Sequence, residues 1–235
     1  MDYTNRSSVP VAISPDSVVS RFFTRVYGWM AGGLALTALV AWTVASSPEL
    51  LSVIVGNKIV FYGLMFAELG LVVWLSGMIG KMSPTTAAGA FLVYSALNGA
   101  TLSVILLLYT GGSVASAFAV TAGTFAGMSI YGMTTKRALD GLGSFCFMGL
   151  IGVVIASLVN LFLKSTMLEF VLSCVSVVVF VGLTAWDTKK LKTMAYGLDP
   201  DSAEAKTGAI RGALALYLDF INLFLALLRL FGRRR

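Results

Sequence analysis

The sequence predicts an all-α, polytopic membrane protein with seven transmembrane helices, and three observations support this fold class. Of the 235 residues, 57% are hydrophobic and only 12% are charged, whereas soluble domains carry about 25% charged residues. The mean hydropathy is +0.88, so polar side chains are too few to cover a soluble surface. The apolar residues also form long continuous runs, which favours helices over the alternating segments of a membrane β-barrel.

A membrane-spanning helix needs about 20 consecutive, mainly apolar residues. Seven runs of this kind follow one another, at residues 26–45, 59–78, 87–108, 114–133, 143–163, 168–186 and 209–230. A largely polar stretch precedes the first run, which indicates a retained tail and not a secretory signal. The predicted organisation is a cytoplasmic amino-terminal tail (1–25, disordered at first and amphipathic over 17–25), a seven-helix membrane domain (26–232) and a basic carboxyl-terminal tail (233–235).

The basic residues between the runs predict the orientation. The connections after the first, third and fifth runs hold only Lys58 and Lys164, whereas the tail and the other connections hold many more. These are Arg6, Arg21, Arg25, Lys81, Lys136, Arg137, Lys189, Lys190, Lys192, Lys206 and Arg211. Positive charge marks the cytoplasmic side, so the amino terminus is predicted to be cytoplasmic. Seven crossings then put the three final arginines outside, and a last segment that turns back before crossing is the alternative.

Several classes of function are excluded at this stage. The basic residues lie between apolar runs and not along one helix face with aromatic residues, so no nucleic-acid partner is expected. Cys146 and Cys174 lie inside apolar runs, and the chain has no histidine, which excludes a disulfide framework and an ordinary zinc site. No phosphate loop, nucleophile elbow or metal-hydrolase motif is present, so we expect neither an enzyme nor a bound cofactor. Glycine pairs at 28 and 32, 123 and 127, and 208 and 212 predict close helix packing within the bundle.

Three acids lie within or at the end of apolar runs, where an ionised side chain costs about 2.5–3.5 kcal/mol at a helix centre. Glu68 is in the second run, Asp187 ends the sixth and Asp219 is in the seventh. Asp219 is about 15 Å from the predicted start of its helix. Asn222, three residues further on, lies on the same helix face and offers a second oxygen ligand.

The predicted orientation places Asp187 and Asp219 in the inner half of the membrane on consecutive helices. Two carboxylates in a low-dielectric site share one proton and titrate as a pair, which gives a pH sensor in a chain without histidine. Loss of that proton leaves two negative charges, and their hard oxygen ligands suit calcium. Two simpler interpretations remain: Asp187 is an ordinary interfacial acid, or the acids only lock helices together.

Two motifs carry a family resemblance. The segments YLDFINLF (217–224) and GLTAWDT (182–188) resemble those of the Bax inhibitor-1 family, also called the transmembrane Bax inhibitor motif family, and the spacing of the spans is similar to its bacterial inner-membrane branch. The resemblance covers the chain after the tail. It implies a seven-helix fold in which the other six helices surround the last one. It also implies that Asp187 and Asp219 form the pH-sensing pair of a proton-sensitive calcium leak in the bacterial inner membrane.

The resemblance extends to the second run, with one departure. Glu68 matches an acidic position of the family. In the calcium-leak relatives an arginine near the cytoplasmic end of this helix latches the aspartates, but here Ile79 takes the equivalent place and Lys81 is the nearest basic residue. A lysine cannot form the bidentate fork of an arginine, so the resemblance leaves the latch in doubt. Family members are also associated with protection from cell death in eukaryotes, and some bacterial relatives with a membrane protease.

These observations predict a pH-sensitive passive calcium or cation leak channel gated by a buried aspartate pair. The alternative is a non-catalytic membrane protein that binds a membrane protease or other membrane proteins through its tail and loops. An intramembrane aspartyl protease also needs two aspartates on consecutive helices. Such enzymes resemble one another through a GxGD motif that contains the second aspartate. Here that place reads LYLD (216–219), and GLG (141–143) is predicted in a loop away from both acids.

Overall fold

The computed structural model describes residues 15–54 and 56–235, and within these ranges it contains helices and no strand. Seven of the described helices are long and apolar enough to cross a membrane, which confirms the predicted fold class. They are α1 (Pro15–Ser46), α3 (Lys58–Met78), α4 (Pro84–Leu108), α5 (Gly111–Thr134), α6 (Asp140–Leu163), α7 (Thr166–Ala195) and α8 (Ala203–Phe231). A short helix, α2 (Pro48–Ile54), follows α1, and a 3-10 turn, η1 (Ile79–Lys81), follows α3.

Polar capping residues fix where most of the spans begin. A side-chain oxygen accepts a backbone N–H of the first turn at five helix starts: Asn57 for α3, Ser83 for α4, Thr110 for α5, Ser165 for α7 and Ser202 for α8. Such caps satisfy donors that have no partner within the helix. The connections between spans can therefore be short, because each helix starts directly after its cap.

All seven spans begin before the predicted apolar runs, five of them by one to three residues and two, α1 and α8, by six or more. α1 starts at Pro15, so residues 15–25 continue the first span as one helix, with Phe22 and Phe23 buried. α8 starts at Ala203 and not at 209. Both added segments mix polar and apolar residues, so a search for apolar runs misses them. Each is nevertheless helical, and one face of each segment packs on the bundle. The predicted disorder at the beginning of the tail concerns residues 1–14, which lie outside the described residues.

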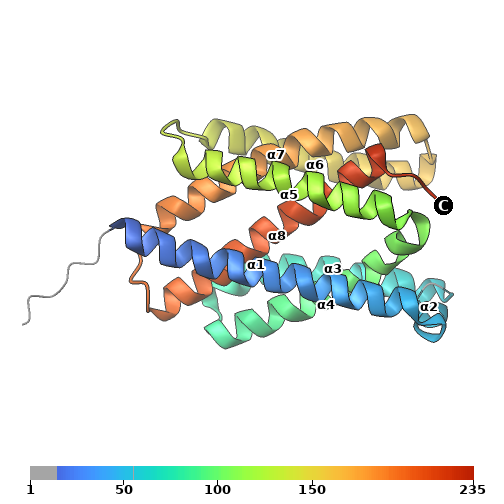
Figure 1. Cartoon of the computed structure of the whole chain (residues 1–235), viewed down its shortest axis with the longest axis horizontal. Coiled ribbons are helices and arrows are strands. Elements are labelled where there is room, and N and C mark those ends of the chain that lie inside the picture. Colours follow the sequence, from blue (N-terminus) through green and yellow to red (C-terminus); the bar gives the residue numbers. More distant parts are fainter. Residues whose placement is uncertain (1–14, 55) are drawn as a thin grey trace, which may run out of the picture.

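The spans form two groups with α8 between them (Figure 1). α1, α3 and α4 make one group, and α5, α6 and α7 make the other. α8 packs against α1, α4, α5 and α7, whereas α3 packs mainly on α4 and α6 mainly on α7. α8 is also the most buried of the described spans: 61% of its most apolar window lies inside the protein, against 6% for α3 and for α6. That all six other helices surround α8 stays a prediction.

Contacts between connections define the two ends of the bundle. At one end, Arg25 donates to the carbonyl of Pro200 and forms a 3.1 Å ion pair with Asp201 between α7 and α8. At the opposite end, the backbone N–H of Thr110 donates to the carbonyl of Arg233 (3.1 Å). We name the first the Arg25 end and the second the Tyr109 end, after the residue that follows α4 and precedes Thr110. α8 runs from the first to the second, which supports seven crossings over a last segment that turns back.

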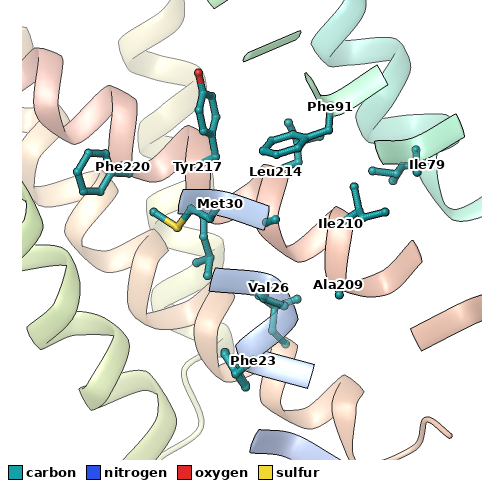
Figure 2. Packing of buried hydrophobic residues seen from close by; sticks show 14 of the residues in the cluster. Phe23, Val26, Met30, Ile79, Phe91, Ala209, Ile210, Leu214, Tyr217 and Phe220 are labelled. Carbon is teal, nitrogen blue, oxygen red and sulfur yellow. The ribbon is translucent and has the colours of Figure 1, made fainter. Parts of the chain in front are cut away.

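The main core forms where α8 meets α1, α4 and η1. Ile210, Leu214 and Tyr217 of α8 are at most 2% exposed, and Val26 and Phe91 contribute side chains from α1 and α4 to the same cluster. Figure 2 shows this cluster, with the α8 side chains lying between those of α1 and α4. The outward faces are apolar as well, as Phe162 at 87% and Ile59 at 84% exposure illustrate. Lipid is the solvent that suits such a surface.

The predicted glycine packing holds for one of the three pairs. A side chain at Gly212 would meet Leu191 and Val26 at 2.7 and 3.3 Å, and Gly208 also lies at van der Waals distance from its neighbours. A Cβ at Gly28 or at any other member of the first two pairs has no neighbour within 4 Å. The four-residue spacing alone cannot tell which face of a helix its glycines occupy.

Candidate functional site

The register of α7 against α8 brings Asp187 to Asp219. The two helices are antiparallel neighbours. Leu183 lies four residues before Asp187, and Leu223 lies four residues after Asp219, so each leucine shares a helix face with its aspartate. Leu183 and Leu223 pack in one buried cluster with Cys146 of α6. The carboxyl groups one turn further on interact directly with each other.

The two carboxyl groups have different exposure. Asp219 is 4% exposed, and its Oδ2 has no hydrogen-bond donor among the described residues. Asp187 is half-buried. The two side chains lie within hydrogen-bonding reach of each other. Because an ionised carboxylate only accepts hydrogen bonds, a hydrogen bond between them would require a proton on one of the two groups. The geometry therefore fits a pair that holds one shared proton.

α8 extends further toward the Arg25 end than the sequence predicts, which changes the position of Asp219 along it. Asp219 lies about 24 Å from the start of α8 and about 18 Å from its end, from the rise of 1.5 Å per residue. It is thus close to the middle of the helix and not in its first half. Asp187 lies about 12 Å before the end of α7. The pair is deeper in the bundle than one end of an apolar run suggests.

Three lysines follow Asp187 on α7, toward the Arg25 end. The ammonium group of Lys190 interacts electrostatically with Asp187 and lies 4.7 Å from the centre of the Trp186 ring. Lys189 and Lys192 donate to backbone carbonyls at the end of α5, at 2.5 and 2.7 Å. The last carbonyls of a helix carry partial negative charge, so these bonds fasten α7 to α5.

Glu68 belongs to a second polar cluster and not to the aspartate pair. Its carboxylate accepts hydrogen bonds from Asn98 and, at 2.9 Å, from Thr101, both on α4. Asn98 is 7% exposed, and its Oδ1 has no partner among the described residues. Glu68 also interacts electrostatically with Tyr94 on the neighbouring turn of α4. This acid therefore joins α3 to α4.

The second cluster reaches α8 through Tyr217. The hydroxyl groups of Tyr217 and Thr37 are 2.7 Å apart, and Thr37 also donates to the carbonyl of Ser95 at 2.8 Å. The Tyr217 ring packs edge-on against Phe91 and Tyr94, with centroids 5.7 and 5.9 Å away. Tyr217 is only two residues from Asp219. The same stretch of α8 thus faces both polar clusters.

Comparison with known proteins identifies the family. Residues 19–235 match the family described as "Inhibitor of apoptosis-promoting Bax1". The chain is 50% identical over 224 residues to the inner membrane protein YbhL of Escherichia coli K12, which covers 95% of this chain and 96% of YbhL. The chain belongs to the Bax inhibitor-1 family. Proteins of Borreliella burgdorferi and Rickettsia prowazekii are each 44% identical to it and cover 93% and 94% of its length.

The position expected for the latch of this Bax inhibitor-1 family member contains no basic side chain. Ile79 is fully buried in the main core. Lys81 is exposed, and within the described ranges it has no ion pair or side-chain hydrogen bond. The charge that reaches Asp187 comes from Lys190 instead. From the sequence, Lys190 was assigned only to the charge bias that sets the orientation, although its spacing of three residues from Asp187 on one helix was a usable signal for a contact.

Two further details concern residues named from the sequence. Asn222 donates its amide to the carbonyl of Leu218 at 2.8 Å, and none of the hydrogen bonds in the described part of the chain joins it to either aspartate. Residues 141–143 lie in the first turn of α6 and not in a loop. Gly143 lies directly against the indole ring of Trp186, the residue before Asp187, so this segment packs on α7. Gly143 admits the ring because it has no side chain.

The metal chemistry of the site depends on two carboxylates alone. Among the described residues no group of three or more His, Cys, Asp and Glu side chains could hold a metal ion. Asp187 and Asp219 together offer four hard oxygens and, when both are ionised, two negative charges. Such a pair fits brief binding of a passing calcium ion, because a permanent calcium site has six to eight oxygen ligands.

Proposed function

We propose that the protein is a pH-sensitive passive leak pathway for cations, with calcium as the favoured ion. The observation that carries this proposal is that Asp187 lies close enough to interact with the buried Asp219, whose Oδ2 has no hydrogen-bond partner in the described part of the protein. With one shared proton the pair has a single negative charge. Loss of the proton adds a second charge, which attracts a divalent cation and loosens the packing of α8 against α7.

The orientation proposed for this pathway follows from charge and from the relatives. YbhL is named an inner membrane protein, and we place this chain in the bacterial inner membrane as well. Most of the basic residues between spans lie at the Arg25 end, which is therefore the cytoplasmic end, together with the amino terminus. The aspartate pair would then exchange protons mainly with the cytoplasm, through the half-buried Asp187.

The proposal can be tested with the purified full-length chain in liposomes that contain a calcium dye. The leak is expected to change between about pH 6 and pH 8, where a shared proton of such a pair can be lost. Ion substitution in the same vesicles tests the preference for calcium. A calcium flux equal to that of protein-free vesicles at every pH would refute the channel function. The proposal also assigns no enzymatic activity, since the pair has no substrate-binding motif beside it.

A second candidate function, binding of other membrane proteins without catalysis, rests on a different feature. A cavity of about 360 Å³ opens at the Arg25 end between the start of α1 and the ends of α5 and α7. Its lining combines aromatic rings, such as Phe23 and Tyr196, with charged groups, such as Asp16 and Lys192. Such a lining suits a peptide segment of a partner, including a membrane protease. Tyr196→Ala, at an exposed residue of this lining, separates the two functions, because it would weaken partner binding and leave an ion leak unchanged.

A further inference from the structure

The carboxyl-terminal tail is fixed against the connection between α4 and α5. Besides the bond between Thr110 and Arg233, the backbone N–H of Arg235 donates to the carbonyl of Leu108 at 2.9 Å. The N–H of Arg233 donates to the hydroxyl of Ser113, also at 2.9 Å. These bonds hold the three arginines of the tail at the Tyr109 end, beside the last turn of α8 (Figure 1).

One of these arginines already has an acidic partner. Arg234 forms a 3.0 Å ion pair with Glu169 in the first turn of α7, and its guanidinium lies 6.0 Å from the centre of the Tyr109 ring. Hydrogen bonding to Tyr109, together with the nearby charge of Glu169, raises the pKa of Arg234 above its ordinary value. Arg234 therefore carries its charge at every accessible pH, and Glu169 neutralises it.

A cavity lies beside this tail (residues 233–235), which we call the strap, and between α4, α7 and α8. Its volume is about 250 Å³. Ile105, Leu108, Leu225 and Leu228 form its apolar lining. α4 and α7 are not among the closely packed helix pairs of the described structure, and the cavity lies between them on α8. An acyl chain matches the apolar chemistry of this lining.

The mouth of the cavity has an excess of positive charge. Arg229 lines it and is exposed, and none of the ion pairs or side-chain hydrogen bonds of residues 15–54 and 56–235 involves Arg229. Arg233 and Arg235 are exposed close by. Arg229 is two residues before the end of α8, which is the depth at which arginines of spanning helices reach lipid phosphates.

We propose that this cavity binds an anionic phospholipid, whose phosphate is held by Arg229 and whose acyl chain covers the apolar lining. The planar guanidinium group offers paired N–H donors that match phosphate oxygens. Arg234 borders the phosphate but keeps Glu169 as its partner, so Arg229 is the residue on which discrimination of lipid charge depends. The proposal is independent of ion conduction through the aspartate pair.

The test compares phosphatidylglycerol with phosphatidylcholine on the full-length chain in a neutral detergent, with lipid binding measured by native mass spectrometry. Phosphatidylglycerol should bind more tightly, and Arg229→Gln should reduce this preference about fivefold, since one arginine near a lipid surface contributes about that factor. Arg21→Gln makes the same charge change at an exposed position of the Arg25 end and should leave the preference unchanged. Thermal unfolding without lipid checks that both variants are folded.

Three results would overturn the proposal. Equal binding of the two lipids would show that the cavity does not select an anionic headgroup. An equal loss in Arg21→Gln and Arg229→Gln would show that net charge, and not this cavity, attracts the lipid. Displacement of phosphatidylglycerol by an equal concentration of inorganic phosphate would show that the apolar lining contributes nothing.

Discussion

Replacement of Asp219 by asparagine tests the aspartate pair most directly. The substitution keeps the shape of the side chain and removes one ionisable group. The amide can donate to the carboxylate of Asp187, which remains within reach, so it replaces the contact that the shared proton makes. We therefore expect the variant to fold, with a melting temperature within a few degrees of the wild type, as is usual when a buried hydrogen bond is kept.

The size of the functional effect follows from the electrostatics of the pair. Two unit charges about 4 Å apart repel by about 4 kcal/mol at an effective dielectric constant of about 20. The doubly ionised pair is therefore disfavoured about a thousandfold relative to two separated carboxylates. A bound calcium ion cancels this repulsion, so proton and calcium compete for the pair. Linkage of one proton to one bound ion changes the apparent calcium affinity by at most about tenfold per pH unit.

The assay is calcium flux into dye-loaded proteoliposomes at several calcium concentrations and pH values. In the wild type, the half-saturating calcium concentration should fall as the pH rises from about 6 to about 8, because fewer protons compete. In Asp219→Asn it should be higher, since one carboxylate remains, and independent of pH. The matched control is Asp140→Asn, an exposed acid in the first turn of α6. A variant at Asp219 that keeps the pH response, or a control that loses it, would refute the shared-proton mechanism.

Three further predictions concern other contacts. Glu68→Gln should keep the pH response of the leak, which the flux assay checks. Glu68→Ala should lower the free energy of unfolding by about 1–3 kcal/mol more than Glu68→Gln does, because in the alanine variant the buried amide of Asn98 loses its acceptor. Chemical denaturation of the two variants measures this difference. Tyr217→Phe removes the 2.7 Å hydrogen bond to α1 and should lower the melting temperature by about 2–4 °C, measured by thermal unfolding. Gly132→Ala places a methyl group against the backbone of α7 and should lower the free energy of unfolding by about 1–3 kcal/mol. Gly127→Ala is the control and should leave it unchanged, because a Cβ at Gly127 has no neighbour within 4 Å. Equal unfolding curves for the two variants would contradict the observed packing of α5 on α7.

Much of the fold could be predicted because the membrane imposes it. A chain that crosses lipid must satisfy its backbone within each helix, so the length and apolar content of a run identify a span. All seven predicted spans fall within described helices. The starts of α1 and α8 were misplaced, because residues 15–25 and 203–208 are helical through packing on their neighbours and not through apolar composition.

The candidate site was predictable only in part. The cost of an ionised acid in lipid singles out Asp187, Asp219 and Glu68, and consecutive antiparallel helices make a contact between the first two plausible. Sequence alone does not give the rotation of α3, which turns Glu68 toward Asn98 and away from the pair. Several lysines follow Asp187, and only the three-residue spacing on the helix singles out Lys190 as the cation beside it.

The position of α8 limits how the loss of a proton can move the helices. Tyr217 and Asp219 point in directions about 200° apart on α8, from 3.6 residues per turn. A rotation of α8 that separates Asp219 from Asp187 would also break the buried contact of Tyr217 with Thr37. Both ends of α8 are fastened as well, by the ion pair of Arg25 and by the strap of the tail. Movement of α7 leaves these three contacts of α8 intact, although it would break the bonds of Lys189 and Lys192 to α5 and the ion pair of Glu169 with Arg234. Repulsion within the pair is therefore expected to displace α7 from a stationary α8, and to open the pathway between these two helices.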